Sequence, residues 1–315
     1  MLDANKVILA VVPHIPAECR PWGRGWCAAL ACILEASAPK PGNVYPGAEF
    51  ADLSYDELVA CGIAIAPWME RAPGRPLGRT VLDAVGASKK VTRANANLGM
   101  ILAIAPLAAV PDGDAFSPST PAVLTPAALA AVLAQMSPAD AADVWQAIAI
   151  AQPGGMGTSE QWDVAGSPPE DLLAAMRLSA SRDSIAKLWA HGYNDLLAGA
   201  AHEIVAEVSG ALPATGPDLF AIIVRVFLRQ LARQPDSLIV RKHGHAVAVD
   251  VSIRAAAVLA QAGESHAGTP AFWAAVAAFD EHLRVPTRIN PGTTADLVAA
   301  ALYIGLWQRQ LPVAV

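Results

Sequence analysis

A glutamate followed by two prolines and a lysine is the part of this sequence best suited to carry chemistry. Residues 26–34 are apolar and predict a buried helix with Glu35 in its last turn. The prolines at 39 and 41 end this helix, because proline fixes φ and has no backbone N–H to donate. The irregular backbone that follows presents Lys40, Gly42 and Asn43. An unpaired buried carboxylate is costly, so Glu35 needs water, a partner, a cation or a substrate. The pattern fits a solvated helix end as well as a reactive site.

Two asparagines precede the most apolar segment of the chain. Asn95 and Asn97 lead into residues 98–110, where asparagine is a poor residue for a helix interior. In one interpretation, Asn95 or Asn97 caps the helix. In the other, the side-chain amide binds a ribose hydroxyl, a phosphate or a metal-bound water. Both interpretations stay open on this pattern.

A glycine-rich turn follows the helix predicted over residues 138–151. Gly154 and Gly155 lack side chains, which lets backbone N–H groups approach a ligand. The turn does not have the Gly-Lys-Ser/Thr ending of a P-loop. A helix end is therefore the simpler interpretation, and a phosphate site is the alternative.

Two further stretches place a carboxylate on a predicted helix. Asp183 lies four residues before Lys187, which is typical of a surface ion pair, but Asp183 can instead bind a metal or act as a base if its face turns inward. The second stretch enters the last apolar helix and contains Asn290, Gly292, Thr293, Thr294 and Asp296. Thr293 is placed to cap that helix with Asp296 reaching back, and a helix N-terminus also attracts phosphate. Asp296 can instead turn toward a cation.

The elements that position these residues are predicted to be helices. Helical periodicity recurs along the chain, whereas strand alternation is almost absent. The predicted helices span residues 26–36, 54–71, 79–91, 96–109, 126–134, 138–151, 169–178, 181–209, 216–233, 246–262, 269–283 and 293–311. Their predicted caps include Ser54, Thr125, Ser137, Ser167 and Thr269. We therefore predict an all-α fold, formed as a single compact multi-helix domain over residues 1–315.

Composition narrows the classes of protein. The chain has 315 residues, 54% of them hydrophobic and 16% charged, which indicates an alanine-rich helical protein with a buried core. Its net charge of −6 and the lack of a basic run interleaved with aromatics argue against nucleic-acid binding. Residues 98–110 fall short of the roughly 20 needed to span a membrane, and the N-terminus resembles no signal peptide. We expect a cytoplasmic protein without a membrane partner. Its cysteines form no CxxC pair and are expected to be reduced: Cys19, Cys27, Cys32 and Cys61.

In this order, the motifs resemble the triphosphoribosyl-dephospho-CoA synthase family. The similarity runs from residue 35 to residue 306. The matching segments are Glu35 with 39–44, then 95–99, 153–157, 183–186 and 290–297. The last two segments fit a branch of shorter relatives, of archaeal and one-carbon-pathway type, especially well.

The resemblance implies an enzyme that joins the ribose C1 of ATP to the 2′-hydroxyl of 3′-dephospho-CoA and releases adenine. It implies ATP and a nucleotide-like acceptor as partners, Mg²⁺ as cofactor, and it allows a homodimer. Glu35 and Asp183 are then catalytic, and the metal ligands are Glu35, Asp183 and Asp296. The residues expected to bind substrate or phosphate are Lys40, Gly42, Asn43, Asn95, Asn97, Gly154, Gly155, Asn290, Gly292, Thr293 and Thr294.

Departures from the family pattern concern the acceptor. Arg93 and Ala94 replace glycines, Ala96 replaces a threonine, and residues 45–50 replace an Asn-Asn-Gly-Ala-His segment of the citrate-lyase branch. An alternative is therefore a ribosyl or phosphoribosyl transfer in the biosynthesis of a tetrahydromethanopterin-type cofactor. Hydrolysis of an N-ribosyl bond and nucleotide binding without catalysis are two further hypotheses.

Overall fold

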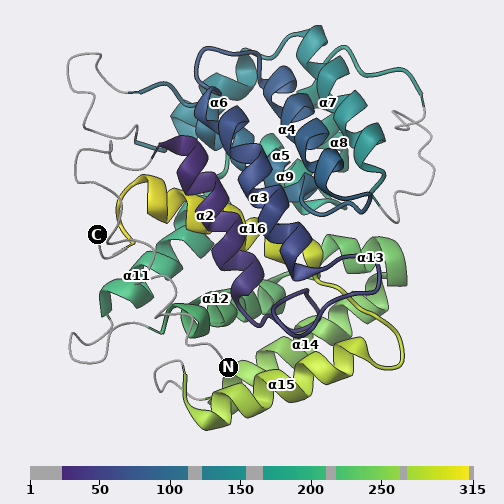
Figure 1. The fold of residues 1–315 in the computed structure, drawn as a ribbon, viewed down its shortest axis with the longest axis vertical. Helices are drawn as coiled ribbons and strands as arrows, with labels where there is room; N and C mark the ends of the chain where they lie inside the picture. The colour runs from purple at the N-terminus through teal and green to yellow at the C-terminus, as the bar shows by residue number, and fades with distance from the viewer. Residues whose placement is uncertain (1–22, 113–122, 154–165, 211–217, 263–267, 312–315) are drawn as a thin grey trace.

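The computed structural model describes residues 23–112, 123–153, 166–210, 218–262 and 268–311, and helices dominate all of them (Figure 1). The first half contains α2 (Arg24–Ser37), α3 (Tyr55–Glu70), α4 (Leu77–Val91), α5 (Leu98–Ala109), α6 (Pro126–Ala134) and α7 (Pro138–Ala151). The second half contains α8 (Leu172–Ser179), α9 (Ser184–Ala190), α10 (Asn194–Leu196), η2 (Leu197–Ala201), α11 (His202–Gly210), α12 (Leu219–Arg233), α13 (Ser237–His243), α14 (His245–Ala262), α15 (Pro270–Arg284) and α16 (Gly292–Trp307). The only β-structure described is a pair of isolated bridges in the loop after α2. The predicted all-α fold is confirmed.

Several of the predicted helices begin at the caps that the sequence predicts. Ser54 and Ser137 each form a capping box with the acidic residue three positions later. Thr125 and Thr269 each accept a hydrogen bond from the third backbone N–H of the helix that follows. Four of the five predicted caps therefore set the start of a helix.

The structure differs from the sequence prediction in three places. The cap of α8 is Asp171 and not Ser167, so this helix begins at Leu172. The long helix predicted over residues 181–209 is broken into α9, α10, η2 and α11, where Tyr193 has φ 66° and Gly199 has non-helical angles. The third difference is α13, which was not predicted, because its 7 residues are too few to show a helical period.

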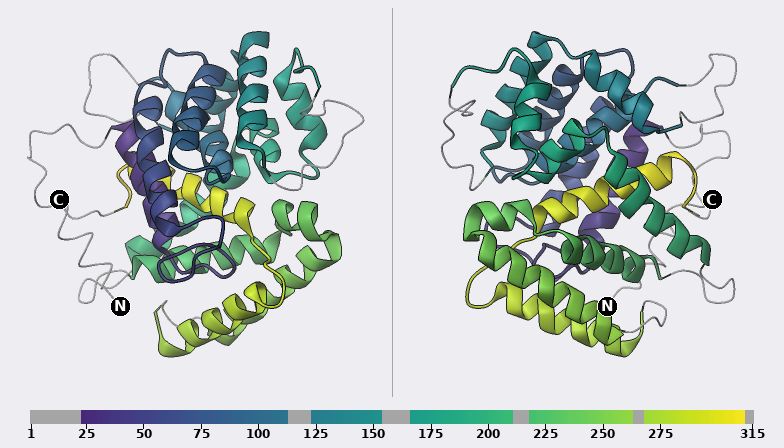
Figure 2. Two further views of the ribbon diagram at one scale, coloured as in Figure 1. Left: turned by 45° about the vertical axis from the view of Figure 1, so that its right-hand side comes forward. Right: turned by 180° about the vertical axis from the view of Figure 1, so that it is seen from behind.

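Two apolar helices lie at the centre of the core. Residues 100–109 of α5 and residues 298–307 of α16 are buried throughout. Figure 2 shows α16 between the upper helices, which include α3 to α9, and the lower helices α12 to α15. Helix α16 contacts α2, α5, α12 and η2. Its first turn therefore lies where segments from both halves of the chain meet.

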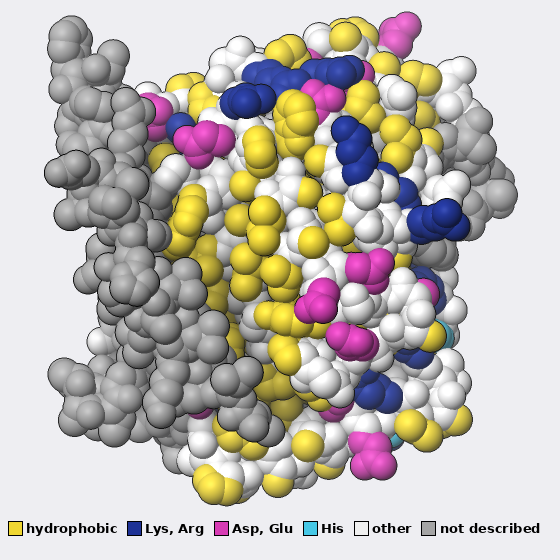
Figure 3. Space-filling model, viewed as in Figure 1, with side chains coloured by type: hydrophobic (Ala, Val, Ile, Leu, Met, Phe, Trp, Pro, Cys, Tyr) yellow, Lys and Arg dark blue, Asp and Glu magenta, His cyan; other side chains and the backbone are white. Residues whose placement is uncertain are grey.

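The surface in the view of Figure 1 carries apolar side chains over α2 and α3 (Figure 3). Helix α3 includes Ile63, which is 56% exposed. Among the helices described, none has both the length and the apolar character to cross a bilayer. Cys27, Cys32 and Cys61 are free, buried thiols, and burial raises the pKa of Cys27 to about 12 and that of Cys61 to about 11. Cys19 lies outside the described residues.

Candidate active site

Glu35 and Lys40 form a buried ion pair at the end of α2. Lys40 Nζ lies 2.8 Å from Glu35 Oε1, and the side chains are 0% and 3% exposed, respectively. The same ammonium donates hydrogen bonds to the backbone carbonyl oxygens of Glu35 and Ala38. Burial raises the pKa of Glu35, and the charge of Lys40 opposes that shift. Glu35 therefore lies in the protein interior with a charged partner, which rules out the solvated helix end.

The backbone after Lys40 fits closely between two other segments. Gly42 has φ 77°, a left-handed conformation that suits glycine. A Cβ at this position would lie 2.5 Å from the carbonyl oxygen of Ile289. The Gly42 N–H donates to Asp280 Oδ1 of α15 at 2.7 Å. A side chain at residue 42 would therefore separate the loop from the segment that leads into α16.

Asp280 and Arg284 of α15 hold the rest of this loop. Asp280 Oδ2 accepts hydrogen bonds from Tyr45 Oη and from Arg284 Nε, both at 2.8 Å. Arg284 also donates to the carbonyl oxygen of Asn43. Burial and the hydrogen bond to Asp280 raise the pKa of Tyr45 to about 12, so its hydroxyl stays protonated at neutral pH. The loop therefore takes its shape from a helix more than 230 residues away in sequence.

Asp236 joins the start of α13 to the start of α16. Its Oδ1 accepts from the backbone N–H groups of Leu238 at 2.8 Å and Ile239 at 3.0 Å. Its Oδ2 accepts from the N–H and the hydroxyl of Thr294, both at 2.7 Å. Burial raises the pKa of Asp236, and the hydrogen bonds from Thr294 oppose the shift. One carboxylate thus caps two helices that border the site.

The prediction that Thr293 caps the last helix is wrong. Helix α16 begins at Gly292, so Thr293 lies inside its first turn. Thr293 Oγ1 instead accepts a hydrogen bond from Ser237 Oγ at 3.1 Å, and Ser237 Oγ accepts one from the N–H of Ser184 at 3.3 Å. This short chain of contacts links the starts of α9, α13 and α16.

Asp183 caps α9 and pairs with α13. Its Oδ1 accepts two backbone N–H groups of α9, both at 2.9 Å, and its Oδ2 forms an ion pair with Arg241. The surface pair with Lys187, one of the two interpretations of the sequence, is not formed. Lys187 Nζ lies 2.7 Å from Asp195 Oδ2 instead. The charge of Asp183 also acts on Asp296 of α16.

Asp296 projects from α16 onto the first turn of α5. A Cβ at Gly99 would lie 1.9 Å from Asp296 Oδ2, so the carboxylate occupies the space that any other residue would fill. Among the described residues, none donates a hydrogen bond to this carboxylate. Burial raises the pKa of Asp296 well above its usual value, and nearby charges act on it too. The charges that add to the shift are Glu35, Asp236 and Asp183, and the charge that opposes it is Arg241.

The predicted asparagines differ in their contacts. Asn95 Oδ1 accepts from the N–H of Leu98, the first residue of α5, at 3.3 Å. Asn97 is 4% exposed, and its Nδ2 has no hydrogen-bond partner among the described residues. The same holds for Asn290 Oδ1, just before α16. Buried polar atoms without partners are rare, so these two amides are suited to a ligand or water.

The expected metal ligands are neighbours, but they are not arranged as a metal site. Within the described ranges, no group of three or more His, Cys, Asp or Glu side chains is placed to hold a metal ion. Glu35 is bound to Lys40, and Asp183 is bound to Arg241. Gly154 and Gly155 lie outside the described residues, so phosphate binding by these two glycines stays a prediction.

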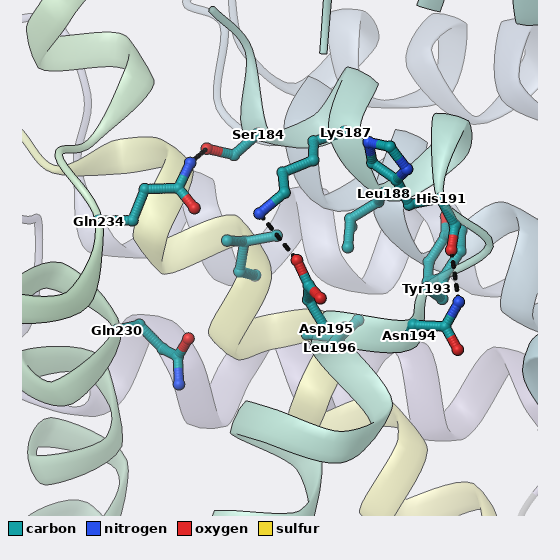
Figure 4. A pocket seen from close by; sticks show the side chains of 11 residues that line it. Ser184, Lys187, Leu188, His191, Tyr193, Asn194, Asp195, Leu196, Gln230 and Gln234 are labelled. Carbon is teal, nitrogen blue, oxygen red and sulfur yellow. Dashed lines mark hydrogen bonds and ion pairs between the residues drawn. The ribbon is translucent and has the colours of Figure 1, made fainter. Parts of the chain in front are cut away.

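A polar pocket opens between α9, α10, α12 and α16 (Figure 4). Its side chains include the ion pair of Lys187 with Asp195, and Gln234, whose Nε2 donates to Ser184 Oγ at 3.4 Å. Leu297, which follows Asp296 in the chain, forms part of its wall. The pocket is therefore lined by α9, which Asp183 caps, and by α16, which carries Asp296.

Sequence reasoning missed Asp236 and Asp280. A signal for Asp236 was available, because it follows a proline and precedes Ser-Leu-Ile-Val, which is a typical helix start. Asp280 gave no such signal, since its partners in the loop after α2 are more than 230 residues away in sequence. The sequence suggested that Arg241 lies in a solvated or phosphate-neutralising loop, but it lies in the last turn of α13 and binds Asp183.

Replacing Asp296 by asparagine is expected to stabilise the fold. The variant keeps the size of the side chain and removes the charge that its acidic neighbours oppose. Because the folded-state pKa of Asp296 is raised, the wild type loses stability as pH rises above the unfolded value toward the folded value. We expect the Asp296→Asn variant to be more stable by about 1 kcal/mol at pH 8, with a smaller difference at pH 5. Urea unfolding in EDTA at both pH values measures this, and equal stability at pH 8 would contradict it.

The fold and the site define an all-helical protein whose candidate site combines carboxylates with helix ends, an arrangement suited to polar, charged substrates. A family model described as ATP:dephospho-CoA triphosphoribosyl transferase matches residues 21–313. The chain belongs to this family of transferases, which move the triphosphoribosyl group of ATP to dephospho-CoA. The family and the reaction class predicted from the motifs are confirmed.

The fold is also similar to a solved structure. This is the crystal structure of a candidate triphosphoribosyl-dephospho-CoA synthase from Archaeoglobus fulgidus, with a TM-score of 0.58 and 22% sequence identity. The match covers 79% of this chain and 98% of the other. A search of the curated proteins found no match.

Proposed function

We propose that Glu35 is the base in the transfer of the triphosphoribosyl group from ATP to an acceptor hydroxyl. The acceptor oxygen forms a bond to the ribose C1, and the bond from C1 to the adenine nitrogen breaks with its electron pair on that nitrogen. Glu35 takes the hydroxyl proton, and adenine takes up one proton as it leaves. The observation that carries this proposal is the placement of Glu35 beside Asp296, on two different helices, at a centre with unpartnered amides. A base works best when its pKa lies near the working pH, and burial moves Glu35 in that direction.

The other predicted residues would orient substrate. Asp183 has its carboxylate bound to Arg241 and to α9, so we assign it the task of holding that guanidinium at the centre. Asn97 and Asn290 have buried amide atoms available for ribose hydroxyls or phosphate oxygens. The pocket of Figure 4 supports the same proposal, because its wall includes Ser184 and Leu297, the residues that follow Asp183 and Asp296 in the chain.

We propose that Mg²⁺ arrives with the phosphates of ATP. Mg²⁺ keeps several waters and is commonly held by one or two carboxylates together with substrate phosphates, so it does not need a group of three protein ligands. Asp296 fits this role, because no described residue occupies its carboxylate. Bound there, the ion would neutralise phosphate charge.

Adenine release tests the function and the role of Glu35. The protein is incubated with ATP, Mg²⁺ and 3′-dephospho-CoA, and both adenine and the mass of the acceptor are measured. The wild type should release adenine only with acceptor, and the Glu35→Gln variant should be slower by about 100-fold or more. Glu281→Gln, an exposed residue of α15, is the control and should match the wild type.

The other outcomes separate the alternatives. Adenine released without acceptor indicates hydrolysis, and ATP binding without adenine release indicates a binding protein. Release that requires a pterin-type acceptor indicates the one-carbon pathway. Full activity in the Glu35→Gln variant would contradict the role of Glu35.

We also propose that the chain is one domain and works in the cytoplasm as a homodimer. The packing of α16 on α2, far apart in sequence, supports one domain. The cytoplasm is proposed because the reaction consumes ATP. The mass in solution tests the homodimer.

A further inference from the structure

A group of basic side chains surrounds an aromatic ring at the edge of the proposed site. The guanidinium of Arg288 lies 4.4 Å from the centre of the Phe50 ring, and that of Arg284 lies 5.6 Å from it. Lys242, on the last turn of α13, has Arg288 and Arg241 as its cationic neighbours. We call Lys242, Arg284 and Arg288 the basic rim. Figure 1 shows three segments that meet at one edge: helix α13, the loop that follows α2, and the segment between α15 and α16.

The three cations of the basic rim differ in how closely a carboxylate is paired with them. Arg284 is bound to Asp280 with Nε to Oδ2 at 2.8 Å, and only 20% of its side chain is exposed. Arg288 is bound to Asp52, a pair that is 42% and 64% exposed. Lys242 is exposed and has no ion pair or hydrogen bond with the described residues. Partial desolvation and the like charges of Arg288 and Arg241 lower the pKa of Lys242, and the negative charge of Asp52 opposes that shift. Asp52 is therefore the carboxylate that an anion would have to replace at both Lys242 and Arg288.

The basic rim is continuous with the site. Arg284 donates to the carbonyl oxygen of Asn43. Arg288 stands two residues before Asn290, whose buried Oδ1 has no partner in the described parts of the chain. Lys242 follows Arg241, which binds Asp183. In the view of Figure 3, this edge shows basic side chains among acidic ones, so the positive charge is local and does not form a broad basic face.

We infer that Lys242 and Arg288 bind the phosphate chain of a nucleotide substrate at the mouth of the site. Identifying that chain as a substrate rests on the proposed function. An ammonium serves as a point charge for phosphate, whereas a guanidinium on an aromatic ring offers a fixed fork of donors. Asp52 holds the fork of Arg288 in the free protein and is exchanged for phosphate oxygens. The triphosphate of ATP and the diphosphate of dephospho-CoA share this chemistry.

Calorimetric titration without turnover tests this inference. The probes are inorganic tripolyphosphate, ATP and 3′-dephospho-CoA, each titrated into the wild type and into Lys242→Gln. We expect Lys242→Gln to weaken tripolyphosphate binding about tenfold, the loss of one charge-assisted contact. Asp52→Asn should tighten it, because the competing carboxylate is gone. Arg71→Gln is the control, since Arg71 follows the end of α3 beside the start of α2, about 15 Å from Glu35 along that helix.

The outcomes separate the two sources of phosphate. Weaker binding of ATP alone assigns the basic rim to the triphosphate, and weaker binding of dephospho-CoA alone assigns it to the acceptor. Unchanged binding of all three probes to Lys242→Gln overturns the inference, as does Asp52→Asn binding tripolyphosphate no tighter than the wild type. A wild type that binds tripolyphosphate through Lys242 but releases no adenine contradicts the proposed function and leaves this inference standing.

Discussion

Replacing Lys40 by methionine is expected to lower the free energy of unfolding by about 3–5 kcal/mol at pH 8, because the change leaves Glu35 buried without its partner. Methionine keeps the length of the side chain and its apolar stem, so the loss reports the charge and not a cavity. The ammonium also donates hydrogen bonds to the carbonyl oxygens of Glu35 and Ala38, and both oxygens lose this donor in the variant. Urea unfolding followed by circular dichroism measures the effect.

The pH dependence of that variant has a definite sign. Burial already raises the pKa of Glu35, and removing Lys40 takes away the charge that opposes the shift. A raised folded-state pKa means that the folded protein holds its proton longer than the unfolded chain does. Stability then falls as pH rises from the unfolded value to the folded value. We expect the cost of Lys40→Met to be smaller at pH 5 than at pH 8.

The double variant provides the control. Glu35→Gln combined with Lys40→Met removes both charges, and a buried ion pair can be replaced by neutral groups at little cost. We expect the double variant to recover most of the stability lost by Lys40→Met and to show little pH dependence. A double variant as unstable as Lys40→Met would contradict the assignment of the loss to an uncompensated carboxylate.

Replacing Asp236 by alanine is expected to lower the free energy of unfolding by about 3 kcal/mol. The carboxylate is 2% exposed and accepts three backbone N–H groups and one hydroxyl. An ordinary helix cap contributes about 1 kcal/mol, and each buried donor left without an acceptor costs about 1–3 kcal/mol. The loss should therefore exceed that of a single cap.

Asp171→Ala is the matched control for this prediction. Asp171 caps α8 through one hydrogen bond, from the N–H of Ala174 at 3.0 Å, on the protein surface. It should cost about 1 kcal/mol. Hydrogen exchange distinguishes the two variants further, since the amide of Thr294 should exchange faster only in Asp236→Ala. Equal losses in the two variants would show that Asp236 is an ordinary cap.

The fold was largely predictable from the sequence because helix starts are local signals. Ser54, Thr125 and Ser137 cap the helices that directly follow them, so a few neighbouring residues determine where each helix begins. The break at Gly199 was not predictable in this way, because glycine occurs in helices as well as at breaks. The start of α13 had a local signal at Asp236, but the helix is too short to show a period, and the contact of Asp236 with α16 appears only in the fold.

The sequence predicted that three carboxylates belong to one site, but it did not predict the residues that pair with them. Glu35, Asp183 and Asp296 were identified from motifs, and the structure places them close enough to shift the pKa of Asp296. The partners were not predictable, because Lys40 binds Glu35 and Arg241 binds Asp183 only after α2, α9 and α13 have packed. Local patterns give the identity of a reactive group, whereas its charge environment comes from the tertiary fold.

The close contact between Gly99 and Asp296 has a consequence for how this site can diverge. The carboxylate of α16 lies in a space that exists because residue 99 of α5 lacks a methyl group. Gly99 itself offers no side chain for chemistry, yet it sets the direction in which the carboxylate points. Relatives that differ only at this position would keep every reactive group and still present a pocket of different shape. A change at residue 99 can therefore alter the shape of this centre without replacing any of its polar side chains.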